Sequence, residues 1–100
     1  MAMIGGTSEL KVADEEVQKI CDEVKSAAEA KAGEKFSQFQ AKSYKTQVVA
    51  GTNFFIKVDV GDGFFVHLRV YRTLPHAGST LELSAIKTGL KDEDDLEYFQ

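Results

Sequence analysis

The chain has 100 residues and a formal net charge of −4, from 16 acidic and 12 basic side chains. This length fits one folding domain, and an apolar fraction of 43% with 10% aromatic residues excludes a disordered chain. The basic residues are scattered singly, so nucleic acid is not expected as a partner. No apolar run approaches the roughly 20 residues that span a bilayer, and a body of this size has no room for a large ligand cavity. We therefore expect no membrane contact and no cofactor.

The ends of the chain and its cysteine content suggest a compartment. The first residues lack the charged-then-apolar pattern of a secretory signal. Cys21 is the single cysteine, so no internal disulfide can form and nothing indicates an oxidising compartment. We expect a cytoplasmic protein, with access to the nucleus, that is not secreted through a signal peptide.

In chain order, the first two elements are an arm and a helix. Residues 1–12 lack periodicity and contain Gly5-Gly6, so they are expected to be extended and flexible. Acidic residues from Asp14 onward favour a helix start, and Gly33 supplies a left-handed stop. Between them, apolar residues recur at the three-and-four spacing of one helical face. These residues are Val17, Ile20, Cys21, Val24 and Ala28.

After the helix, the apolar pattern changes to the period of two that is typical of half-buried strands. The clearest runs are 54–60 and 64–71, joined by the tight turn Gly61-Asp62-Gly63. Weaker patterns predict strands over about 41–49 and 81–85, and residues 96–99 are expected to add a last short strand. The predicted fold is α+β, with one long helix packed across a four- to five-stranded antiparallel sheet.

The segment 47–51 places Val48 and Val49 at an expected chain reversal. Valine in a solvent-facing turn loses hydration free energy without packing in return, so a partner is expected to cover it. In an up-and-down sheet, this reversal and the connection 74–78 lie at one end, and the turn at 61–63 lies at the other. If the helix runs antiparallel to the first long strand, the N-terminal arm also falls at the apolar end.

No residue pattern predicts catalysis or metal binding. Cys21 could pair with His67 or His76 as a nucleophile, but it shares the apolar helix face, which indicates a buried, inert thiol. His67 alternates with core residues and is expected to point to solvent. The acidic run 92–95 lacks the spaced ligands and turn glycine of a calcium loop. Without a convergent Cys/His, Ser/His or carboxylate pair, we expect no enzymatic activity and no metal.

The run from Tyr44 to Val58 resembles the stefins, the single-domain intracellular branch of the cystatin inhibitors of papain-like cysteine proteases. Its centre, 47–51, is similar to the family signature, and Gly5-Gly6 sits where stefins carry an N-terminal glycine. Leu74-Pro75-His76 resembles the second binding hairpin of the B-type members. The resemblance covers nearly the whole chain, follows the family only loosely over 80–95, and is closest to the B- and A-type stefins. It implies a cystatin-like fold, with residues 1–100 as a single domain and 1–12 as a flexible binding arm.

The resemblance further implies reversible, tight-binding, competitive inhibition of papain-like proteases: papain, cathepsins of the B, H, L and S types, or foreign proteases. The arm and two hairpin loops would enter the active-site cleft as a wedge that makes no bond to the catalytic thiol. Gln47 would form amide hydrogen bonds either within its hairpin or to the enzyme. The implied protease-binding residues are Met3, Ile4, Gly5, Gly6, Gln47, Val48, Val49, Ala50, Gly51, Leu74, Pro75 and His76.

Two alternatives stay open at the level of sequence. One is a non-inhibitory interaction module with the same fold, although such a module would have no cause to keep exposed valines. The other concerns assembly: a strained tip at Val48-Val49 could straighten and let two chains exchange the helix and first strands as a domain-swapped dimer. Such a dimer would bury the tip and not inhibit, so the active form is expected to be the monomer.

Overall fold

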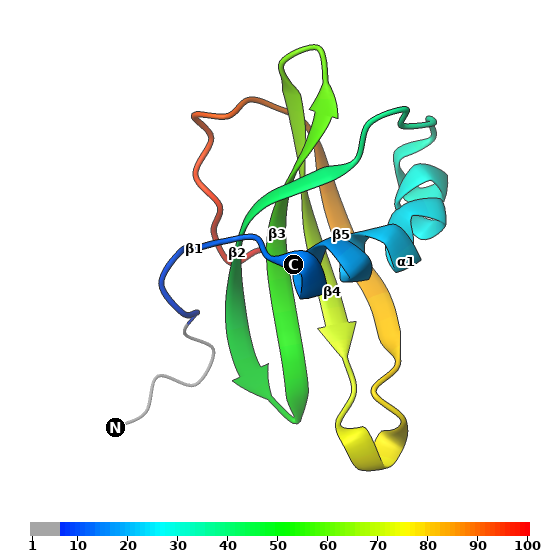
Figure 1. Ribbon diagram of the computed structural model, residues 1–100, viewed down its shortest axis with the longest axis vertical. Helices are drawn as coiled ribbons and strands as arrows, with labels where there is room; N and C mark the ends of the chain where they lie inside the picture. Colours follow the sequence, from blue (N-terminus) through cyan, green and yellow to red (C-terminus); the bar gives the residue numbers. More distant parts are fainter. Residues whose placement is uncertain (1–6) are drawn as a thin grey trace.

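Residues 7–100, which the computed structural model describes, form one long helix and a five-stranded antiparallel sheet (Figure 1). In chain order the elements are β1 (Lys11–Val12), α1 (Glu15–Ala32), β2 (Gln40–Val49), β3 (Gly51–Gly61), β4 (Phe64–Arg72), the short 3-10 helix η1 (Pro75–Ala77) and β5 (Leu81–Leu90). The strands lie in the sheet in sequence order, each antiparallel to its neighbours. The predicted α+β fold is confirmed.

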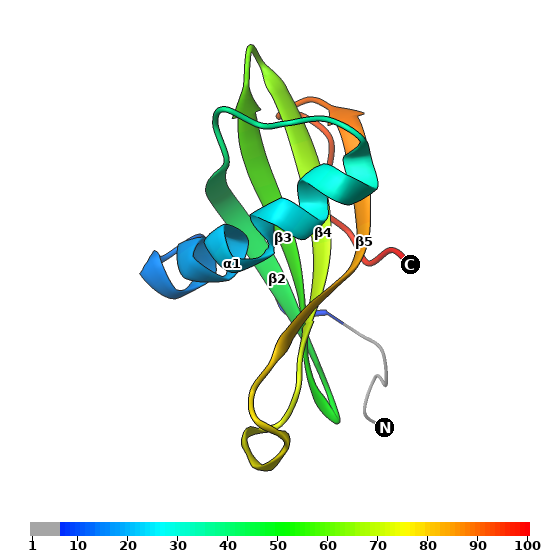
Figure 2. The same cartoon turned by 90° about the vertical axis from the view of Figure 1, so that its right-hand side faces the viewer.

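The helix α1 has the ends that the sequence predicts. The Asp14 carboxylate accepts a hydrogen bond from the Val17 amide at 3.0 Å, which caps the first turn. Gly33 adopts the left-handed conformation, with φ of 73°, and its amide donates to the Glu29 carbonyl at 2.8 Å. All five apolar residues of the predicted face are buried. Figure 2 shows α1 crossing one face of the sheet, where this apolar face packs.

The main core lies between α1 and the inner face of the sheet. Alternate residues of the two central strands point into it, as the period-two pattern predicts. Phe54, Ile56 and Val58 come from β3, and Val66, Leu68 and Val70 come from β4. Each of these six side chains is at least 96% buried.

The C-terminal segment, residues 91–100, covers the opposite, outer face of the sheet (Figures 1 and 2). Leu96 and Phe99 are buried there against Phe55, which is fully buried, and the Phe55 and Phe99 ring centroids are 6.0 Å apart. The predicted strand over 96–99 is therefore wrong. This segment packs on the face of the sheet because Leu96 and Phe99, three residues apart, both meet Phe55, which a period-two strand at the edge would not allow.

The fifth strand is instead β1, which sequence analysis did not predict. Lys11 pairs with Tyr44 and Val12 with Ser43. Further back, the Ser8 amide donates to the Thr46 carbonyl at 2.7 Å. Residues 7–12 are extended as expected, but these hydrogen bonds hold them along β2, whereas their composition predicted a flexible arm. Residues 1–6 lie outside the described residues.

His67 also differs from its prediction. Its side chain is 2% exposed, so the expected solvent-facing position is wrong. His67 lies on the face away from α1, as the period of two predicts, but this face is not open, because the C-terminal segment covers it. Burial, and to a smaller extent the Lys57 and Lys87 ammonium groups, lower the pKa of His67, and the Asp94 carboxylate opposes them; the resulting pKa is about 4.

Candidate functional site

The first tip, residues 47–51, is the turn between β2 and β3. Val49 pairs with Gly51 and Val48 with Thr52, so the chain reverses at Ala50. The side chain of Val48 is 80% exposed and that of Val49 is 40% exposed. Two apolar side chains therefore stand in solvent at the end of a regular hairpin, as the sequence predicts.

The conformation of this tip depends on Gly51. Its φ is 114°, in the region that favours glycine. A Cβ atom there would lie 2.4 Å from the Arg72 carbonyl oxygen and 2.9 Å from the Tyr71 side chain, both at the end of β4. The Tyr71 hydroxyl also donates a hydrogen bond to the Ala50 carbonyl. The end of β4 thus supports the first tip from the side.

Gln47 lies at the base of the first tip and is 4% exposed. Its amide oxygen accepts a hydrogen bond of 2.7 Å from the Asn53 side-chain amide, and the two residues face each other across the hairpin. Gln47 was predicted to form hydrogen bonds either within its hairpin or to the enzyme, and in the structure it forms one within the hairpin. A buried side chain in this position stabilises the tip and leaves little surface for direct contact with a partner.

The second loop, residues 74–78, connects β4 to β5 and contains η1. All of its residues are exposed, and Leu74 is 38% exposed. The loop is closed by hydrogen bonds: the Thr73 amide donates to the Thr80 carbonyl at 3.0 Å, and the Thr80 amide donates to the Thr73 hydroxyl at 2.8 Å. Pro75 begins η1 and His76 follows it. The second loop is therefore ordered without a partner.

The first tip and the second loop lie at the same end of the sheet, and the β3–β4 turn lies at the other end (Figure 1). The predicted placement of these connections is confirmed. Because β1 runs antiparallel to β2 and Ser8 lies opposite Thr46, the described start of the chain also reaches this end. Met3, Ile4, Gly5 and Gly6 were predicted to act here, and they lie outside the described residues.

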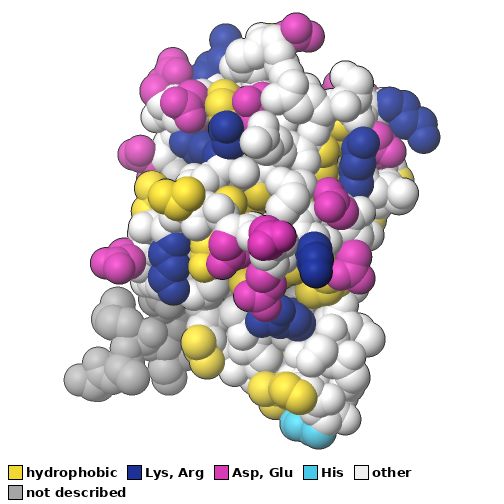
Figure 3. Space-filling view, viewed as in Figure 1, with side chains coloured by type: hydrophobic (Ala, Val, Ile, Leu, Met, Phe, Trp, Pro, Cys, Tyr) yellow, Lys and Arg dark blue, Asp and Glu magenta, His cyan; other side chains and the backbone are white. Residues whose placement is uncertain are grey.

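This end of the molecule carries few charges. The stretches 46–56 and 73–81 contain no Asp, Glu, Lys or Arg. In Figure 3 the lower end of the visible face shows hydrophobic and uncharged side chains, whereas acidic and basic groups crowd the surface above it. A partner that binds this end would therefore meet apolar side chains and backbone.

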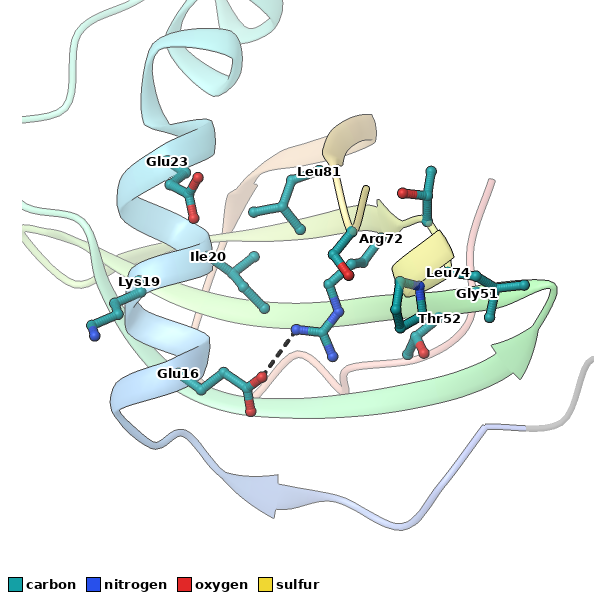
Figure 4. Close-up of a pocket in the computed structure, with 12 residues that line it drawn as sticks. Glu16, Lys19, Ile20, Glu23, Gly51, Thr52, Arg72, Leu74 and Leu81 are labelled. Atoms are coloured by element: carbon teal, nitrogen blue, oxygen red, sulfur yellow. Dashed lines mark hydrogen bonds and ion pairs between the residues drawn. The ribbon is translucent and has the colours of Figure 1, made fainter. Parts of the chain in front are cut away.

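An open hollow of about 370 Å³ lies beside the second loop, between α1 and the ends of β3 and β4 (Figure 4). On one side of it, the Arg72 guanidinium pairs with the Glu16 carboxylate at 2.9 Å and stacks 4.8 Å from the centroid of the Phe54 ring. Ile20 and Leu81 provide apolar lining. The ion pair connects the start of α1 to the strand that leads into the second loop.

The single cysteine of the chain lies away from this end. Cys21 is fully buried in the main core, and burial raises the pKa of its thiol to about 12, with a smaller effect of the Asp22 carboxylate. Across residues 7–100, no group of His, Cys, Asp and Glu has the geometry to hold a metal ion. Over the same residues, no helix is both long and apolar enough to cross a membrane.

Sequence reasoning missed two residues that shape the first tip, Asn53 and Tyr71. Asn53 could have been found from the hairpin register, since a turn centred on Ala50 places position 53 opposite Gln47. Tyr71 had no such signal, because its contact with Ala50 joins residues from different hairpins.

Comparisons with known proteins place the chain in a family. A model described as "Cystatin domain" matches residues 5–89. The chain is similar to Cystatin-B of Paralichthys olivaceus, with 56% identity over 97 residues that cover 97% of this chain and 99% of that protein. Cystatin-B of Oplegnathus fasciatus is 52% identical, covering 97% of each chain, and Cystatin-B of Homo sapiens is 50% identical, covering 97% of this chain and 99% of that one. The chain therefore belongs to the cystatin family of cysteine protease inhibitors, in its stefin B-like branch.

Proposed function

We propose that this protein is a reversible, tight-binding, competitive inhibitor of papain-like cysteine proteases, acting as a monomer. The first tip and the second loop enter the active-site cleft and block it sterically. The observation that carries this mechanism is the 80% exposure of Val48 at an ordered tip that shares an uncharged end of the sheet with Leu74. Papain and cathepsins of the B, H, L and S types are the proposed targets.

Apolar burial would supply the affinity. Each Å² of apolar surface removed from water contributes about 25 cal/mol, so covering the exposed parts of Val48, Val49 and Leu74 is worth several kcal/mol before ordering costs. Those costs are small for this end of the molecule, because hydrogen bonds within the hairpin and the second loop already order both segments.

The N-terminal arm is proposed to complete the wedge. The described chain reaches the apolar end at Ser8, whose amide donates to the carbonyl of Thr46, three residues before Val49. Met3 and Ile4 are proposed to fill the subsites on the non-primed side of the cleft. Gly5 and Gly6 would let the backbone pass close to the cleft wall, because a side chain there would add bulk.

The test is a titration of active-site-calibrated papain with the protein, at several concentrations of a fluorogenic peptide substrate. We expect stoichiometric, reversible inhibition that higher substrate concentrations relieve. The variant Val48→Asp should raise Ki by about 100-fold, since it replaces a central apolar contact by a charge that loses its hydration.

The matched control is Val12→Asp. Val12 is 84% exposed, close to the 80% of Val48, but it lies in β1, paired with Ser43, outside the residues 3–6 that are proposed to enter the cleft. At about 3.3 Å per residue along β2, that position is roughly 20 Å from the tip. Val12→Asp should leave Ki within about 3-fold of the wild-type value. Equal losses in the two variants would contradict the proposed site, and a wild-type monomer without inhibitory activity would favour a non-inhibitory interaction module.

A further inference from the structure

We propose that the Tyr71 hydroxyl is a positioning group that holds the first tip in the conformation that binds the protease and couples the tip to the second loop. This inference rests on the proposed function and adds a residue outside the two binding segments. Tyr71 itself lies in β4 and is only partly exposed.

The hydrogen bonds of the turn support this role. The hairpin ladder ends at the pair Val49 and Gly51, so Ala50 has no partner across the turn. The Tyr71 hydroxyl donates to the Ala50 carbonyl from the strand beyond β3. A side chain from outside the hairpin therefore supplies the apex of the first tip with its hydrogen bond.

The close packing of the first tip against β4 supports the same role. A Cβ atom at Gly51 would lie 2.9 Å from both Cε1 and the hydroxyl oxygen of Tyr71, and 2.4 Å from the Arg72 carbonyl oxygen. The backbone of the tip is thus in close contact with the end of β4. The missing side chain at Gly51 allows the Tyr71 ring to come near enough for its hydroxyl to reach Ala50.

The course of the chain links this contact to the second loop. Tyr71 and Arg72 end β4 and lead within two residues to Leu74. Arg72 pairs with Leu81 at the start of β5 and with the Glu16 carboxylate at 2.9 Å, so this end of β4 is held on several sides. The hydrogen bond to Ala50 therefore connects the first tip to the fixed base of the second loop, and it limits the movement of one segment relative to the other.

Loss of the hydroxyl should make the first tip more mobile without changing the surface that it presents. A more mobile tip loses more conformational entropy on binding, so the complex should dissociate faster. The variant Tyr71→Phe removes only the hydroxyl. Its matched control is Tyr44→Phe, which removes a hydroxyl from a partly buried ring in β2 that packs on Phe54, with ring centroids 6.4 Å apart.

The first measurement needs no protease. Hydrogen exchange of the backbone amides of residues 48–52 should be about 3- to 10-fold faster in Tyr71→Phe than in the wild type, the factor that corresponds to one net hydrogen bond. The urea midpoint of global unfolding should stay close to the wild-type value, because the contact is at the end of the molecule. Tyr44→Phe should leave exchange at the tip unchanged.

The second measurement is the kinetics of binding to papain. Tyr71→Phe should raise the dissociation rate constant by about 3- to 10-fold and leave the association rate constant within about 2-fold. A residue that only contributed to global stability would change the urea midpoint and not the dissociation rate.

Unchanged exchange at the tip in Tyr71→Phe, or equal acceleration in Tyr44→Phe, would overturn the positioning role. Faster exchange with an unchanged dissociation rate would overturn the part of the inference that concerns binding. If the wild-type protein does not inhibit papain, the proposed function fails and the binding part fails with it, while the exchange measurement still decides whether Tyr71 orders the tip.

Discussion

The two histidines of this chain have opposite environments. His76 lies exposed on η1, whereas His67 is 2% exposed on the outer face of the sheet. The imidazole of His67 is kept neutral by burial first and by the neighbouring Lys57 and Lys87 ammonium groups second, which lowers its pKa to about 4. The burial of this one residue therefore links folding to pH.

The sign of this effect follows from the two pKa values. Well above pH 6.5, His67 is neutral in both the folded and the unfolded chain, so it does not change the free energy of unfolding. Between pH 6.5 and about 4 the unfolded chain takes up a proton that the folded chain does not. The free energy of unfolding should therefore fall over this range, by up to about 3 kcal/mol.

Urea unfolding of the wild type, His67→Gln and His76→Gln at pH values from 7.0 to 4.5 checks this. The decrease towards acid should be smaller in His67→Gln than in the wild type, because this variant has no imidazole to protonate. His76→Gln, at an exposed position, is the control for the loss of an imidazole. Parallel profiles for the wild type and His67→Gln would contradict the assignment.

At the scale of elements, α1 is the clearest case of local control. Its first turn is capped by the Asp14 carboxylate through the Val17 amide, at 3.0 Å. Asp14→Ala removes this acceptor and should lower the free energy of unfolding by about 1 kcal/mol. Urea denaturation of Asp14→Ala beside Glu23→Ala, an exposed substitution in the middle of the same helix, measures the difference. Equal stabilities of the two variants would show that the cap contributes nothing.

The sheet edge shows the opposite kind of control. β1 has two residues, and their side chains, Lys11 and Val12, are both exposed. Nothing in such a short exposed pair predicts a strand, because there is no alternation to detect. Its position depends on β2, which offers free backbone groups along its outer edge.

At the scale of the whole molecule, the sheet has two covered faces. The helix covers the inner face and the C-terminal segment covers the outer face, where Leu96 and Phe99 are 3% and 7% exposed. This second, smaller core closes over Phe55 in the centre of β3. The stability of the fold should therefore depend on residues close to the end of the chain.

Phe99→Ala tests this dependence. Loss of the ring removes its contact with Phe55 and should lower the free energy of unfolding by about 3 kcal/mol, the lower end of the range for a buried phenylalanine. The control is Glu97→Ala, an exposed position in the same segment. Denaturant unfolding of both variants gives the comparison, and a Phe99→Ala variant as stable as the control would mean that the outer core is not required.

Much of the fold could be predicted because it depends on neighbours in the sequence. The cap at Asp14 and the stop at Gly33 act within one helical turn, and the alternation of β3 and β4 follows from the geometry of a strand. The exposed valines at the first tip followed in the same way, from a turn between two strands. The placement of this tip beside the second loop needed only the rule that successive connections of an up-and-down sheet alternate between its ends.

By itself, then, the sequence determined the helix, the strand directions and the apolar end of this protein, because those depend on local conformation and on chain order. Only the tertiary structure decided the burial of His67, the face-on packing of Phe99, the partner of Gln47 and the hydrogen bond from Tyr71 to Ala50. Each of these is set by the exact approach of one packed segment to another, and neither the period of a strand nor the order of the strands specifies which side chain another segment will cover or reach.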